Sequence, residues 1–141
     1  MSDVIAMNSL SLSAAQRIVE AAIATARSEN VTASIAVCDP AGEAIVTVRM
    51  DGAARLTAQI ALNKAYTVAS FNGMPTDKWW SVLADDPALV HGFTQTPRLV
   101  VFAGGVPVRV GGEIVGAVGV SGGSSEQDRV IAQAGADVMR P

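Results

Sequence analysis

The chain has 141 residues and a formal net charge of −3; half of its residues are hydrophobic and only 16% are charged. This length predicts a single domain over residues 1–141, and the scattered basic residues argue against nucleic acid as a partner. No apolar run reaches the roughly 20 residues of a membrane span, and no secretory signal is recognisable. We therefore expect a cytoplasmic protein with no membrane partner. The hydrophobic content is high for a protein of this size, and we expect the additional apolar residues to form contacts within a homo-oligomer.

A helix followed by a β-hairpin is expected in the first third of the chain. Residues 1–9 are mixed in character and are expected to be loose. Apolar residues then recur at three- and four-residue spacing, which predicts an amphipathic helix that ends near Asn30. Residues 33–38 and 43–50 predict two antiparallel strands, joined by a turn with Pro and Gly at the positions that a type I turn prefers.

A long helix and an irregular crossover follow the hairpin. The helix is predicted over residues 54–71 and is broken by Gly73 and Pro75. The crossover, residues 72–97, holds both tryptophans, the only histidine and two short helical stretches. Such a segment can be a lid over a pocket or a packed plug at one end of the sheet, and the sequence leaves both readings open.

The last third of the chain predicts three strands and a helix. Residues 99–102 form the first of these strands, and residues 106–110 and 114–120 form a hairpin around the Gly111-Gly112 turn. The uncharged strand 114–120 belongs at the centre of the sheet, where its glycines allow another backbone or a ligand to approach closely. Ser124 has the spacing of a capping box at the start of the final helix.

The order of the predicted elements sets the fold class. It is helix, two strands, helix with crossover, three strands and helix. Hairpins separated by helices are typical of a layered α+β domain. We therefore predict a five-stranded antiparallel sheet with helices packed on it.

Lys64 is the most informative single residue. Its neighbours one turn away on the predicted helix are uncharged, so its ammonium either reaches solvent along the helix or points into a pocket. A buried ammonium needs carboxylate or carbonyl partners, and Asp39, Asp51 and Asp128 are the candidates. A structural tie between the helix and a neighbouring loop is the alternative to ligand contact.

The turn Gly122-Gly123-Ser124 leads into the N-terminus of the last helix. Backbone N–H groups at such a position suit a carboxylate or a phosphate, although Asp128 in the first helical turn already complements the helix dipole. The residues thus allow either an anion site or a tight, capped turn. In the first case we expect a pocket for an anionic ligand between Lys64 and this turn.

Four further residues carry candidate chemistry. Arg49 can pair with a ligand carboxylate, and Trp79 can line an aromatic pocket, the core or a subunit contact. His91 is a lone histidine that is either structural or an acid–base group. No metal centre is expected from one histidine and one cysteine, and Cys38, in an apolar strand, is expected to be an inert thiol.

Three motifs resemble the GlcG/HbpS family and occur in the family's order. They are CDPAGEAIVTVRMDGA at residues 38–53, IALNKAYTVASFNGMPT at residues 60–76 and GGVPVRVGGEIVGAVGVSGG at residues 104–123. The resemblance extends over about residues 10–136 and implies a profilin-like α/β sandwich that is commonly an oligomer. The site positions that it carries over are Lys64, Asp51, Gly122, Gly123 and Asp128.

Haem is the cofactor that this resemblance implies. Members of the family are haem-binding or haem-degrading proteins, glycolate-operon proteins, or the C-terminal domain of PduO-type corrinoid proteins. Haem-binding relatives can use a histidine of the first helix as an iron ligand, and this first helix has none. No spacing identifies an axial ligand among the remaining candidates, which are His91, Cys38, Met50, Met74, Tyr66 and Lys64.

These features favour a small-ligand-binding protein of the GlcG/HbpS type, with an anionic ligand such as haem or another tetrapyrrole. The expected ligand contacts are Lys64, Gly122, Gly123, Ser124, Asp128, Arg49 and Trp79. The alternative is a cofactor-free enzyme that acts on a small organic acid, with Lys64, His91 and Asp51 as acid–base residues and the glycine turn stabilising an oxyanion. A purely structural interaction domain is a third hypothesis.

Overall fold

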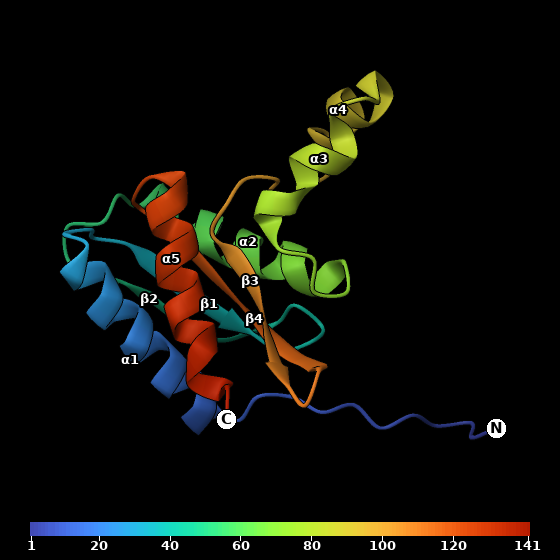
Figure 1. Cartoon of the computed structure of the whole chain (residues 1–141), viewed down its shortest axis with the longest axis horizontal. Coiled ribbons are helices and arrows are strands. Elements are labelled where there is room, and N and C mark those ends of the chain that lie inside the picture. The colour runs from blue at the N-terminus through green and yellow to red at the C-terminus, as the bar shows by residue number, and fades with distance from the viewer.

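The computed structural model describes all 141 residues as an antiparallel sheet between two helical layers (Figure 1). Helices α1 and α5 cover one face of the sheet and α2 covers the other. The helices are α1 (Leu12–Ser28), α2 (Leu56–Ser70), α3 (Trp79–Leu83), α4 (Pro87–Phe93) and α5 (Ser125–Ala136), with 3-10 turns η1 (Thr76–Lys78) and η2 (Asp137–Met139). The strands are β1 (Ser34–Cys38), β2 (Ala44–Arg49), β3 (Gly105–Val110) and β4 (Glu113–Ser121). The predicted α+β class is confirmed, while the profilin-like description stays a prediction.

The sheet has four strands in the order β2-β1-β4-β3, not the predicted five. Residues 99–102 form no strand, because the backbone N–H of Val100 donates to the Thr67 hydroxyl of α2 at 3.0 Å instead of joining a ladder. The predicted central strand is correct, since β4 lies between β1 and β3. Gly111 and Gly112, with φ of 57° and 81°, make the predicted tight turn between β3 and β4.

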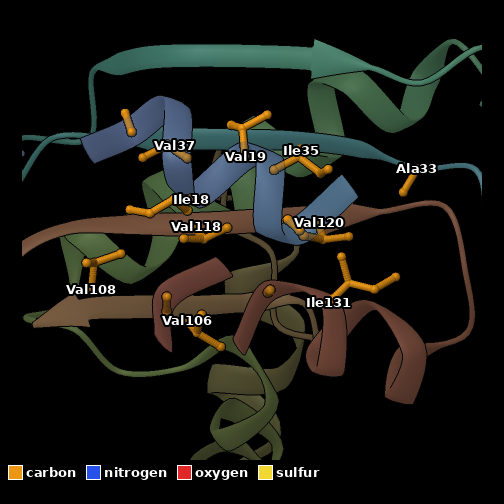
Figure 2. Packing of buried hydrophobic residues seen from close by; sticks show 14 of the residues in the cluster. Ile18, Val19, Ala33, Ile35, Val37, Val106, Val108, Val118, Val120 and Ile131 are labelled. Atoms are coloured by element: carbon orange, nitrogen blue, oxygen red, sulfur yellow. The ribbon is translucent and has the colours of Figure 1, made fainter. Parts of the chain in front are cut away.

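The larger part of the core lies between the sheet and the α1–α5 layer (Figure 2). Valine and isoleucine side chains of β1, β3 and β4 meet Ile18 and Val19 of α1 and Ile131 of α5 in this layer. Helix α5 begins where the sequence predicts, because Ser124 closes the capping box, and Ser11 caps α1.

The other face of the sheet carries only small side chains and lies very close to α2. Ala61 and Ala65 of α2 pack on Ala36 and Ala117 of the sheet. A Cβ at Gly119 would come within 1.9 Å of the Ala61 carbonyl oxygen. Close approach of another backbone is therefore the reason for this glycine, and α2 lies directly on β4.

The crossover residues 76–96, which we call the arm, project from the body of the protein (Figure 1). The base of the arm is packed, because Trp79 is buried and its ring meets those of Phe71 and Phe93 at centroid distances of 4.6 and 5.0 Å. Its outer helix, α4, has no buried residue. The base of the arm is thus packed against the body of the protein, as in the plug hypothesis, and its tip projects outward.

Candidate functional site

Lys64 lies inside the protein as half of a buried ion pair. Its side chain is 1% exposed, and its Nζ donates to Asp128 Oδ2 at 3.1 Å and to the Val120 carbonyl oxygen at 2.7 Å. Burial lowers the pKa of Lys64, and the Asp128 carboxylate partly offsets that shift. Gly104 covers the amine closely, since a Cβ there would lie 2.6 Å from Nζ. The pair ties α2 to α5 at the end of β4.

The glycine turn before α5 is joined to the same pair. Asp128 Oδ1 accepts from the backbone N–H of Gly123 at 2.8 Å, so one carboxylate binds both the turn and the Lys64 ammonium. The Ser124 hydroxyl accepts from Gln127 N in the predicted capping box. Within this chain Asp128 therefore supplies the carboxylate partner of Lys64, and the arrangement has the form of the structural tie.

The main cavity of the molecule lies elsewhere, between the C-terminal end of α1 and the end of β2. It has a volume of about 560 Å³, and we call it the Arg27–Arg49 cavity. Two guanidinium groups, Asn30, Thr32 and the Asp51 carboxylate supply its polar wall. Its apolar wall consists of Ile23, Val31, Val48 and Met50. An anion with an apolar body matches this combination of cations and hydrophobic side chains.

Two smaller cavities are less suited to such a ligand. One, of about 320 Å³, lies between the segment before α1 and the β3–β4 hairpin, and its charged residue is Glu113. The other, of about 220 Å³, contains Arg109 and Arg140 but has a single hydrophobic residue. Arg140 is already paired with Asp137 at 3.1 Å. The Arg27–Arg49 cavity alone combines its size with unpaired cations and an apolar wall.

The predicted site residues thus separate into different places. Arg49 and Asp51 line the Arg27–Arg49 cavity, whereas Lys64 is in the buried ion pair. His91 is exposed on α4 of the arm, and Trp79 packs in the aromatic cluster at its base. The three residues of the enzyme hypothesis, Lys64, His91 and Asp51, are therefore not brought together.

Arg27 and Asn30 are cavity residues that the sequence reasoning missed. A signal for them existed in the predicted topology. Because β1 starts where α1 ends and β2 is antiparallel to β1, the end of α1 and the end of β2 must lie side by side. Basic residues at both ends, Arg27 and Arg49, therefore had to converge.

Of the candidate iron ligands, only Met50 lines this cavity. Cys38 is buried between the sheet and α2, and burial raises the pKa of its thiol to about 12. The Tyr66 ring lies beneath the guanidinium of Arg98, with its centroid 3.8 Å from Cζ. No three His, Cys, Asp or Glu side chains meet in a group that would hold a metal ion, and no helix has the length and apolar character of a membrane span.

Comparison with known protein families shows to which family this chain belongs. A family described as "Haem degrading protein HbpS-like" matches residues 10–137. The chain belongs to this HbpS-like family. The match spans the whole sheet, all five α-helices and both polar sites described above.

Two relatives in sequence support the HbpS-like assignment. GlcG of Escherichia coli strain K12 is 38% identical over 112 residues, which are 79% of this chain and 81% of GlcG. A protein of Citrobacter freundii, described as an uncharacterized 15.0 kDa protein in the dhaT-dhaS intergenic region, is 36% identical over 128 residues, 91% of this chain and 90% of its own length. The predicted resemblance to the GlcG/HbpS family is confirmed.

Three crystal structures have the same fold. Klebsiella pneumoniae ORFY matches with a TM-score of 0.91 at 32% identity, over 99% of this chain and 96% of its own. HbpS matches at 0.87 and 34% identity, again over 99% and 96%. A structure described as the PduOC:Heme complex matches at 0.84 and 29% identity, over 94% of this chain and 96% of its own. The arrangement of sheet and helices is thus that of the HbpS-like proteins.

Proposed function

We propose that this protein binds an anionic small molecule in the Arg27–Arg49 cavity, and that the ligand is haem or a related tetrapyrrole. The observation that carries the proposal is the pairing of two arginines with an apolar wall in one cavity of about 560 Å³. Pockets for small molecules and cofactors typically measure about 300–1,000 Å³. The cavity is therefore large enough for a ligand of this class.

The chemistry of the wall fits a tetrapyrrole. Haem is a flat apolar ring with two carboxylates, and a guanidinium binds a carboxylate through two parallel hydrogen bonds. Arg27 and Arg49 would hold the carboxylates, while Val31 and Val48 contact the ring. The thioether of Met50, a type of side chain that ligates haem iron in other proteins, accepts from the Ala33 N–H at 3.5 Å and would have to give up that partner to serve as a ligand. Bound haem would supply redox and oxygen chemistry, and the residues of the cavity would bind and orient it.

The relatives support the same ligand class. The family description names haem degradation, and one solved relative is described as a complex with haem. The first-helix histidine that such relatives can use is missing here. A sulfur ligand from Met50 and carboxylate binding by the two arginines would compensate for it.

Titration with haemin, followed by the Soret absorption, tests this proposal. We expect equimolar binding by the unaltered protein. Arg49→Ala and Arg27→Ala should each weaken binding by about ten- to a hundredfold, because a hydrogen bond to a charged group contributes about 1.5–3 kcal/mol. Met50→Leu should shift the position of the Soret band with little loss of affinity.

A matched control separates this site from general charge effects. Arg55 is exposed and lies outside the cavity, so Arg55→Ala should bind haemin like the unaltered protein. Equal weakening in Arg55→Ala and Arg49→Ala would contradict the assignment of the cavity. An unchanged Soret band on adding haemin would remove haem as the ligand.

A further inference from the structure

Helices α3 and α4 at the tip of the arm carry apolar side chains that the rest of the chain leaves exposed. Trp80 is 63% exposed, Val82 is 52% exposed and Leu89 of α4 is 37% exposed, whereas Phe93 at the end of α4 packs on Trp79 at the base of the arm. A helix of this length is marginal in water unless it packs against another surface. We therefore expect another protein surface to pack on the tip of the arm.

The charge of the tip limits what can cover it. Asp85 and Asp86 lie in the turn between α3 and α4. Asp86 caps α4 by accepting from Ala88 N and Leu89 N, and Asp85 has no hydrogen-bond or ion-pair partner in the chain. Two arms packed against each other would bring like charges together, which is unfavourable. The complementary surface is basic and partly apolar.

The chain itself supplies such a surface. The wall of the Arg27–Arg49 cavity combines two guanidinium groups and one carboxylate, Asp51, with four apolar side chains. Neither Arg27 nor Arg49 is paired with a carboxylate of its own chain. An acidic, apolar arm and a basic, apolar cavity on one molecule fit a second copy of the same chain as the partner.

We infer that the arm of one copy docks on the Arg27–Arg49 cavity of a second copy and forms its outer wall. A contact between two different surfaces is heterologous and closes into a ring when the rotation allows it. A guanidinium has five N–H donors, so each arginine can bind Asp85 at the rim and a ligand carboxylate inside. The contact would also bring His91, the only histidine, to a cavity whose own wall has none.

The docking contact stands without the ligand, whereas its role in closing the binding site rests on the proposed function. A charge exchange tests the contact by light scattering after size-exclusion chromatography. The arm variant is Val82→Lys with Asp85→Lys, and the cavity variant is Arg27→Glu with Arg49→Glu. All four positions are exposed, so folding should be kept. Asp86 is left unchanged because it caps α4.

We expect the unaltered protein to associate, and each variant alone to associate at least tenfold more weakly. An equimolar mixture should recover association, because the lysine arm of one variant meets the glutamate cavity of the other. The control, Arg17→Glu with Arg55→Glu, makes the same change of charge outside the cavity and should associate normally. A monomeric unaltered protein would overturn the contact.

Two other results would also overturn it. One is loss of association in the arm variant with none in the cavity variant, which would mean that arms pair with arms or with another surface. The second is a mixture that stays dissociated although circular dichroism shows both variants folded.

Titration of the arm variant with haemin tests whether the arm of a second copy closes the binding site. Weaker binding with a shifted Soret band supports closure, and unchanged binding contradicts it while leaving the mass measurements valid.

Discussion

The two polar sites of this protein use their charges in opposite ways. At the end of β4, Lys64 and Asp128 are both buried and satisfy each other, the Val120 carbonyl and the Gly123 N–H. In the Arg27–Arg49 cavity the guanidinium groups lie at the surface beside apolar side chains and have no carboxylate partner. One arrangement is complete within the chain, and the other is left open for a molecule from outside.

A buried charge is weak evidence for a binding site. An ammonium removed from water must be paired inside the protein, so burial of Lys64 requires a partner such as Asp128 whatever the protein binds. An exposed arginine at the rim of an apolar cavity has no such requirement. Its placement there is better explained by a ligand or a partner surface.

Replacing Lys64 is expected to have the largest effect on folding. Lys64→Met leaves the Asp128 carboxylate buried with the Gly123 N–H as its remaining partner, and breaking a buried pair in this way costs about 3–5 kcal/mol. Urea denaturation at neutral pH measures the loss. The double variant Lys64→Met with Asp128→Asn removes both charges and should regain most of it.

Ligand binding distinguishes this role from a binding role. If Lys64 is structural, folded Lys64→Met should bind haemin with unchanged affinity, in contrast to Arg49→Ala. Loss of haemin binding in a variant that stays folded would place the ligand at the buried pair and not in the Arg27–Arg49 cavity. A loss of less than about 1 kcal/mol in stability, the range of surface pairs, would show that the amine is solvated.

Gly119→Ala is expected to have the next largest effect and to disturb one site alone. The added Cβ would meet the Ala61 carbonyl oxygen at 1.9 Å and push α2, which carries Lys64, away from β4. Overpacking of this kind costs up to about 3 kcal/mol. Thermal and urea denaturation would show the loss, while haemin affinity should persist because no α2 residue lines the Arg27–Arg49 cavity.

Gly92→Ala is the matched control for this glycine. Gly92 lies inside α4 and a Cβ there would meet no atom within 4 Å. The substitution should therefore stabilise by about 0.5–1 kcal/mol, the difference between alanine and glycine within a helix. Equal effects of the two substitutions would contradict the tight seat of α2 on the sheet.

Local chemistry let the sequence predict most of the fold. The serine cap of α5, the Gly-Gly turn and the uncharged strand each depend on neighbouring residues, and the structure places them as predicted. Residues 99–102 were misassigned because their apolar run is typical of a strand. The competing partner, the Thr67 hydroxyl, is 33 residues away in the sequence from Val100.

The candidate site was less predictable for a physical reason. Asp128 was one of three carboxylates considered for Lys64, but spacing along the chain does not show whether a ligand lies between two charged groups. The arm likewise has the composition of a packed segment, and only its position shows that its tip is uncovered. Arg27 reaches the cavity because the end of α1 lies beside the end of β2, and that placement depends on how the strands pair and not on spacing along the chain.

The smallest expected effect is a pH dependence that belongs to the buried pair. Burial lowers the pKa of Lys64 below its ordinary value of 10.5, so between the two values the unfolded chain binds more protons than the folded one. The free energy of unfolding must therefore rise with pH across that window and level off above 10.5. Subtracting the curve of Lys64→Met removes the contributions of the groups that do not contact Lys64. A difference curve that is flat or falls with pH would mean that the Lys64 ammonium is not desolvated. The Lys64–Asp128 pair would then not differ from the Arg27–Arg49 cavity in its exposure to water, which is the difference from which their separate roles are inferred.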